Sequence, residues 1–173
     1  HYRIYSIDNI GEGNKSELTD ALVYPAGQKQ IADHLASVLD QLGVGSSPVL
    51  GSSNGGFVAM SYALHYPERV DALLLFGPMG LTRLSGKSIM MLSLATMYPF
   101  QFIRDRVAIW AFGDAPVVHE NYGEWFNVIL QGTIPSVAMP VPLTKAQRQG
   151  MRCPVLLYLG TEDPIVGDAK EAS

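Results

Sequence analysis

Residues 49–78 read VLGSSNGGFVAMSYALHYPERVDALLLFGP. A short apolar run ends at a serine pair, glycines follow, and Phe57, Met60 and Leu64 then recur at helical spacing within residues 54–66. The next run, DALLLF at 71–76, has the composition of a buried strand. The order strand, tight turn, helix and strand is typical of a parallel α/β sheet. This stretch therefore predicts an α/β fold.

The turn itself favours one of the two serines as a reactive residue. Ser53 is flanked two residues away on each side by Gly51 and Gly55, which fits the pattern G-x-S-x-G, whereas larger residues hold the same positions around Ser52. A sharp strand-to-helix turn strains its central residue and crowds these flanks together, so both must be small. We predict that Ser53 is an exposed nucleophile and that Ser52 only separates Gly51 from Ser53, without a part in the chemistry.

Two further groups fit acyl-transfer chemistry at Ser53. Asn54 opens the predicted helix, where a backbone N–H can hold the negative charge that develops on a substrate carbonyl oxygen. Asp163 follows a predicted strand at residues 153–160, in LGTEDPIV, at the edge where parallel strands assemble sites. Its neighbour Glu162 is a competing acid, but the G-x-x-D spacing favours Asp163.

The sequence offers no clear base. A serine hydroxyl needs one to remove its proton, and histidine is the usual choice. Three of the four histidines are not placed to reach Ser53 from the predicted elements: His1, His34 and His65. For the fourth, His119, a surface or packing role is favoured over that of the base. His119 lies in a predicted insertion that could overhang the site.

The remaining segments complete an α/β core with an insertion. We predict a strand at Tyr2–Ile7, a helix over residues 28–42 ended by Gly43, and strands that are nearly continuous apolar runs, as in a sheet covered on both faces. The core comprises residues 1–80 and 151–173. Residues 81–150 lack the alternation of strand and turn signals seen in the core segments. We therefore predict that they form a mostly helical cap, or lid.

Three apolar residues are candidates for substrate binding. Met79 follows the strand at 71–76, at the carboxyl edge of the sheet. Trp110 and Trp125 lie in the predicted cap, where they either line an apolar acyl pocket or pack lid helices against the core.

Composition excludes several classes of protein. The net charge of −4 arises from scattered acids and bases without a basic cluster, which argues against nucleic acid and anionic lipid as partners. No uncharged apolar stretch reaches the roughly 18 residues of a membrane span. Cys153 is the only cysteine, which excludes intrachain disulfides and favours a cytoplasmic location, and no signal peptide is visible.

Three stretches together resemble the α/β-hydrolase fold family, and within it the bacterial carboxylesterase-like members with a helical cap. They are YRIYSIDNIGEGNKS, VLGSSNGGFVAMSYALHYPERVDALLLFGP and CPVLLYLGTEDPIV. The resemblance implies Ser53 as nucleophile, Asp163 as triad acid and the Asn54 amide as one oxyanion donor. It also implies hydrolysis of a small apolar ester or acyl compound through an acyl-enzyme (EC 3.1.1 type), with no metal or organic cofactor.

Two features of that family have no counterpart in this sequence. The family's triad histidine follows the acid after one more helix and strand, whereas ten residues follow Asp163. The family's second oxyanion amide comes from a loop ahead of the YRIYSID strand. We therefore expect the chain to be a segment of a longer hydrolase, lacking N-terminal strands and the C-terminal histidine segment, and inactive alone.

Other functions remain open on the sequence. A perhydrolase or a hydrolase of carbon–carbon bonds uses the same triad. A non-catalytic α/β-hydrolase-like binding protein is the alternative of a different class, motivated by the missing histidine.

Overall fold

The computed structural model describes residues 3–9, 27–98, 100–113, 128, 140–161 and 163–166. The chain divides into two compact units, His1–Tyr24 with Leu94–Ser136 and Pro25–Ser93 with Val137–Ser173. The second, called the core unit below, contains the sheet and the helices that pack on it.

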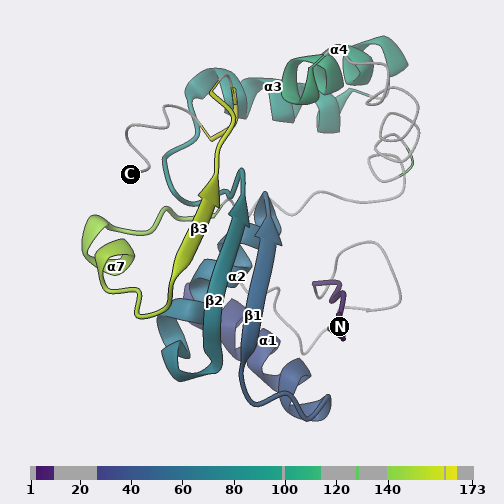
Figure 1. The fold of residues 1–173 in the computed structure, drawn as a ribbon. Helices are drawn as coiled ribbons and strands as arrows, with labels where there is room; N and C mark the ends of the chain where they lie inside the picture. Colours follow the sequence, from purple (N-terminus) through teal and green to yellow (C-terminus); the bar gives the residue numbers. More distant parts are fainter. Residues whose placement is uncertain are drawn as a thin grey trace. The chain divides into compact units, whose positions relative to one another are not determined.

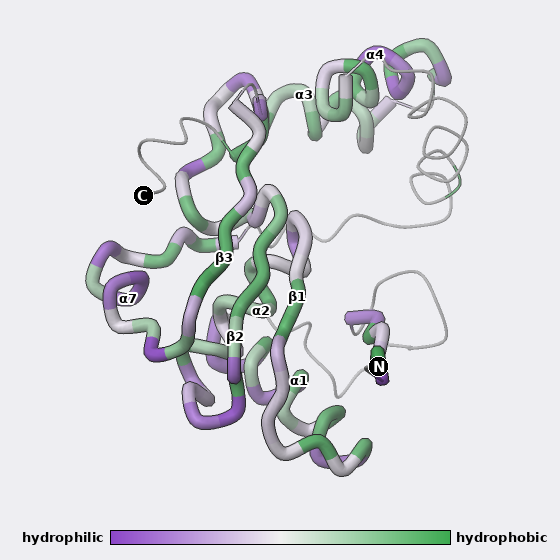
Figure 2. Tube along the Cα trace, viewed as in Figure 1, coloured by the Kyte–Doolittle hydropathy of each residue, from purple (hydrophilic) through white to green (hydrophobic). Residues whose placement is uncertain are grey.

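The sheet of the core unit is parallel, as predicted. Its strands lie in the order β1 (Ser47–Ser52), β2 (Val70–Phe76) and β3 (Val155–Tyr158). The register pairs Ser52 with Phe76 and Phe76 with Tyr158, so the strands end side by side. Figure 2 shows apolar residues along most of β2 and β3 and in the middle of β1. The carboxyl ends of β1, β2 and β3 therefore form one edge.

Helix α1 (Gln28–Gln41) confirms the helix predicted at 28–42. Its buried stripe includes Leu35 and Leu39, at the predicted spacing. The helix ends at Gly43, whose φ of 68° lies in the left-handed region that glycine adopts without strain. The turn is closed by a hydrogen bond of 2.9 Å from the Val44 N–H to the Leu39 carbonyl.

Helix α2 (Asn54–His65) connects β1 to β2 through a short 3-10 turn, Pro67–Arg69. It lies against one face of the sheet, and α1 packs against α2 (Figure 1). Its buried residues include Phe57, Met60 and Tyr62. Arg69 then fastens the loop after α1, because its guanidinium donates to the carbonyls of Val44 and Gly45. These contacts fix the direction of β1 and of the turn that follows it.

The second face of the sheet differs from the prediction that both faces are covered. Side chains that alternate with the buried ones stay exposed among the described residues: Leu50 is 65% exposed, Leu156 50% and Tyr158 53%. The Tyr158 ring stacks on that of Phe76, with centroids 4.8 Å apart. The physical reason is that α1 stacks on α2 rather than on the sheet, so these two helices cover one face only.

The strand predicted at Tyr2–Ile7 is wrong for the residues that the structure describes. Residues 3–9 have no strand assignment, and Ile4 is 87% exposed. A strand is stabilised by hydrogen bonds to a neighbour. The pairings of the described sheet join only β1, β2 and β3, so an apolar, β-branched run alone does not make residues 3–9 a strand.

Helices form much of the described part of the predicted cap: α3 (Gly86–Met97), α4 (Gln101–Phe112) and the short α7 (Lys145–Gln149). The division between the two units falls inside this stretch, so that residues 81–93 and 137–150 belong to the core unit. The bounds 81–150 of a cap therefore remain a prediction. Within the described ranges, no helix combines the length and the apolar character that crossing a membrane requires.

Candidate active site

Ser53 forms the turn between β1 and α2. Its backbone angles are φ 49° and ψ −121°, and among the described residues it is the only non-glycine residue with positive φ. The Ser53 N–H donates to the Phe76 carbonyl at 3.1 Å, and the Ser53 carbonyl accepts from the Met79 N–H at 2.9 Å. The side chain is exposed. Bonds to β2 and to the segment after it thus hold the strained turn and leave the hydroxyl accessible.

The crowding behind this turn is real but asymmetric. A Cβ atom at Gly51 would lie 2.4 Å from the Gly55 carbonyl oxygen, and one at Gly56 would lie 2.4 Å from the Pro78 Cβ. A Cβ atom at Gly55 would meet nothing within 4 Å. The expectation that both flanks of Ser53 must be small is therefore correct for Gly51 and wrong for Gly55, whose backbone makes the close contact while its own Cβ position is open.

Asn54 is the first residue of α2 and is half-buried. The first turn of a helix carries the positive partial charge of the helix dipole. The Gly56 N–H, in this first turn, bonds to the Ser53 carbonyl at 3.0 Å. Asn54 therefore stands directly beside the exposed hydroxyl, although its role as an oxyanion donor remains a prediction.

Asp163 lies in the loop after β3 and is half-buried. Its Oδ1 accepts hydrogen bonds from the backbone N–H groups of Ile165 at 2.8 Å and Val166 at 2.9 Å. Its Oδ2 faces Gly77, where an added Cβ would come within 3.2 Å. One carboxylate oxygen is thus held by the loop, and the other is directed to the end of β2.

The structure brings Ser53 and Asp163 to the same edge of the sheet. Ser53 bonds to Phe76, the last residue of β2, and Asp163 lies against Gly77, the next residue. Gly77 is itself bonded to β3, because its N–H donates to the Tyr158 carbonyl at 2.9 Å. Glu162, the competing acid, lies outside the described residues.

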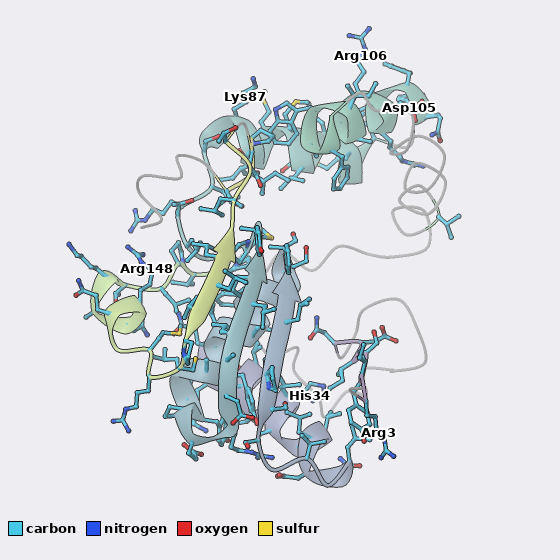
Figure 3. All side chains as sticks on the ribbon, in the orientation of Figure 1. Arg3, His34, Lys87, Asp105, Arg106 and Arg148 are labelled. Atoms are coloured by element: carbon cyan, nitrogen blue, oxygen red, sulfur yellow. The ribbon has the colours of Figure 1, made fainter. Side chains whose placement is uncertain are left out.

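Neither histidine in the described ranges reaches this edge. His65 ends α2, and because Ser53 precedes the start of that helix, a rise of 1.5 Å per residue separates the two by roughly 18 Å. His34 lies on α1, toward the opposite end of the strands (Figure 3). His1 and His119 lie outside the described residues.

The predicted substrate-binding residues have different outcomes. Met79 is half-buried and is tied to the Ser53 carbonyl through its own N–H, so it stands next to the turn. Trp110 is a half-buried residue of α4, in the other unit, and Trp125 lies outside the described residues. Sequence reasoning missed Gly77 and Pro78 as supports of the site. The signal was present in FGPMG, because glycine and proline directly after a strand mark a constrained turn.

Clear pKa shifts in the core unit occur at the other end of the sheet. Hydrogen bonds from Lys29 and from Tyr66, just past the far end of α2, lower the pKa of Asp33. Burial raises the pKa of the Cys153 thiol, which precedes β3. No group of His, Cys, Asp and Glu side chains within the described ranges is arranged to hold a metal ion.

Strand, strained serine turn and helix, in this order on a parallel sheet, define the arrangement of an α/β hydrolase. Residues 1–90 match the family model of the alpha/beta hydrolase fold, and the chain belongs to this family. The predicted fold class and family resemblance are thereby confirmed.

Similar proteins include a carboxylesterase and a hydrolase of a dienedioate compound. The chain is 25% identical to the uncharacterized carboxylesterase nap of Bacillus subtilis, over 95% of this chain and 55% of that protein. It is 40% identical to a 2-hydroxy-6-oxononadienedioate/2-hydroxy-6-oxononatrienedioate hydrolase of Burkholderia vietnamiensis, over 44% of this chain and 25% of that protein. The crystal structure of naproxen esterase from Bacillus subtilis superimposes with a TM-score of 0.80 at 25% identity, covering 95% of this chain and 58% of that one. The chain thus spans about half the length of its esterase relatives.

Proposed function

We propose that the intact protein is a serine hydrolase that cleaves carboxylic esters or related acyl compounds through an acyl-enzyme. The observation that carries the proposal is the strained, exposed Ser53 bonded to β2 at the point where Asp163 approaches from β3. Backbone strain of this kind costs about 1–3 kcal/mol and persists where the surroundings enforce it, typically at functional sites. The likeness to carboxylesterases over nearly the whole chain supports the same chemistry.

Each group has a defined task in this reaction. The Ser53 hydroxyl attacks the substrate carbonyl carbon and gives its proton to a histidine base, and the Asn54 N–H stabilises the resulting oxyanion. The base then protonates the departing alcohol, which leaves an acyl group on Ser53. Water activated by the same base releases the acid. Asp163 orients the base through Oδ2, because its Oδ1 is occupied by the Ile165 and Val166 amides.

The base is proposed to lie in a part of the protein that follows Asp163. His34 and His65 are excluded by their positions, and the esterase relatives are almost twice as long as this chain. The 173 residues alone are accordingly expected to be inactive.

A fluorophosphonate probe on the full-length protein tests this assignment. Labelling is expected for the unmodified protein and for Ser52→Ala, which removes the neighbouring hydroxyl, and it is expected to vanish in Ser53→Ala. Labelling that persists in Ser53→Ala would reject Ser53 as the nucleophile. A full-length protein that resists the probe would instead favour the non-catalytic binding protein.

A carbon–carbon bond hydrolase is the second candidate, and the 40% identity to a 2-hydroxy-6-oxononadienedioate/2-hydroxy-6-oxononatrienedioate hydrolase favours it. That match covers less than half of the chain, whereas the carboxylesterase match covers 95%. Turnover of p-nitrophenyl esters and of a 2-hydroxy-6-oxo-dienoate by the same preparation decides between them. A perhydrolase would show itself by forming a peracid from a carboxylic acid and hydrogen peroxide.

A further inference from the structure

We propose that Thr82 and Ser88, at the start of the predicted cap, are positioning residues for Asp163. They hold the loop that carries the acid, and so they set where its free oxygen points. The inference rests on the proposed function, since it presumes that Asp163 orients the base.

The contacts run from the cap stem, defined as residues 80–88, to the acid loop, residues 163–166. Ser88 is completely buried, and its Oγ donates to the Pro164 carbonyl at 2.8 Å. Thr82 Oγ1 donates to the Val166 carbonyl. Both stem hydroxyls thus bind carbonyls of the acid loop. Pro164 lies 76 positions after Ser88 in the chain, and Val166 lies 84 positions after Thr82.

The acid loop is therefore held from two sides. Asp163 Oδ1 accepts from the N–H groups of Ile165 and Val166, while the carbonyls of Pro164 and Val166 accept from the stem. Proline has a fixed φ and no N–H, which limits how Pro164 can rearrange. The rotation of the Asp163 carboxylate is coupled through these bonds to the stem.

The Ser88 hydroxyl is held in a donor role. Its Oγ also lies 2.8 Å from the Ser85 Oγ, and Ser85 Oγ accepts from the Ser88 N–H at 3.0 Å. A buried carbonyl that loses its partner is costly. Removing the Ser88 hydroxyl would leave the Pro164 carbonyl to find a new donor, and the acid loop would shift.

The stem is fixed to the rest of the core unit on its other side. The Leu143 N–H donates to the Gly80 carbonyl at 2.8 Å, and the Arg148 guanidinium of α7 donates to the carbonyls of Leu81 at 3.1 Å and Leu143 at 2.9 Å. Arg148 is labelled on α7 in Figure 3. The chain before and after the predicted cap is joined here, so that the stem is a fixed support from which Thr82 and Ser88 reach the acid loop.

The test uses the full-length protein and compares substitutions that keep or remove one hydroxyl. Thr82→Val replaces the hydroxyl with a methyl group of similar size, and Thr82→Ser keeps it. Ser88→Ala removes the second donor. Tyr66→Phe is the matched control, because it removes a hydroxyl that donates to Asp33 at the other end of the core unit, away from the stem and the acid loop.

We expect Thr82→Val and Ser88→Ala to lower kcat on a p-nitrophenyl ester by roughly tenfold to a hundredfold with little change in KM, the scale of a misplaced catalytic group. A well-placed carboxylate raises the pKa of its histidine. Its displacement should therefore move the acid limb of the kcat/KM profile to lower pH. Thr82→Ser should keep both values as in the unmodified protein, and Tyr66→Phe should lower the melting temperature while leaving them unchanged.

Two outcomes separate this inference from the proposed function. In the first outcome, Asp163→Asn abolishes turnover, but the folded variants Thr82→Val and Ser88→Ala have the same kcat and the same acid limb as the unmodified protein. The positioning role is then rejected, and the proposed function stands. If Asp163→Asn retains full turnover, the assignment of the acid itself fails, and the inference fails with it. Should Ser88→Ala not fold, the Thr82 pair decides alone.

Discussion

At the scale of single residues, the geometry of the serine turn depends on a position where a Cβ atom does not fit. Gly51 and Gly55 both flank Ser53 in the sequence, yet only the Gly51 Cβ position is blocked. The pattern G-x-S-x-G reports that two segments are close. It does not report toward which neighbour each Cβ would point, because that depends on the orientation of a strand residue and of a helix residue.

Alanine at these two positions should therefore have opposite effects. Gly51→Ala places a Cβ 2.4 Å from a backbone oxygen, and we expect a loss of about 1–3 kcal/mol in the free energy of unfolding together with slower probe labelling. Gly55→Ala meets open space in a helix and should stabilise the protein by about 0.5–1 kcal/mol. Urea unfolding of both variants measures this. Equal destabilisation by both would contradict the asymmetric packing.

Gly77 is the residue against which the acid rests. Its φ of 47° disfavours any side chain, and an added Cβ would lie 3.2 Å from Asp163 Oδ2. We expect Gly77→Ala to cost about 1–2 kcal/mol in strain and also to lower kcat, because the acid is displaced. Gly43→Ala is the control, since its φ of 68° carries similar strain with nothing within 4 Å of the Cβ. Equal kcat values for the two variants would show that Asp163 does not depend on this contact.

At the scale of secondary-structure elements, a polar cluster joins α1 to the far end of α2. Asp33 of α1 accepts hydrogen bonds from Lys29, one turn earlier, and from the Tyr66 hydroxyl just after α2. These bonds favour the charged carboxylate and lower its pKa below the ordinary value of 3.8. The contribution to stability is therefore complete above pH 3.8 and is lost as the pH falls through the lower pKa of the folded protein.

Tyr66→Phe removes the bond between the two elements and keeps the one within α1. We expect the pKa of Asp33 to rise toward its ordinary value, while the Lys29 contact keeps it from returning fully. The titration of the Asp33 carboxyl carbon by NMR measures the shift. Arg69→Gln is a suitable control, because Arg69 bonds to Asp40 and to the loop carbonyls instead. An Asp33 pKa that stays the same in Tyr66→Phe would show that the tyrosine bond does not form in solution.

Elements with local signals were predictable, and those that depend on partners were not. The spacing of Leu35 and Leu39 with Gly43 behind them identified α1 almost to the residue, and DALLLF identified β2. The run at Tyr2–Ile7 has equally good strand composition, yet residues 3–9 are not a strand. A strand exists only with neighbours, and composition does not state whether they are present. For the same reason, apolar strands did not reveal which face α1 and α2 would leave uncovered.

At the scale of the whole molecule, the sequence offers candidates for two of the three groups in the proposed triad. Ser53 and Asp163 became candidates because a turn pattern and a strand end each carry a local signature. The structure places both residues at one edge of the sheet, and their catalytic roles remain a proposal. The hydrogen bonds of Thr82 and Ser88 to the acid loop were not predictable. Their partners lie 84 and 76 positions later in the chain, and no motif around the two hydroxyls marks them. The base has no candidate among the described histidines.

The origin of the base gives a prediction for the protein as a whole. In the full-length protein, His34→Ala and His65→Ala should leave kcat unchanged, because α1 and the far end of α2 hold these residues away from Ser53. The 173 residues alone should turn over esters about 10⁶-fold more slowly than the full-length protein, the scale of loss when a triad histidine is removed. Ester turnover by the two proteins at equal concentration measures this, and circular dichroism confirms that the shorter chain is folded. A folded 173-residue chain with full activity would place the base within these residues, with His1 and His119 as the next to substitute.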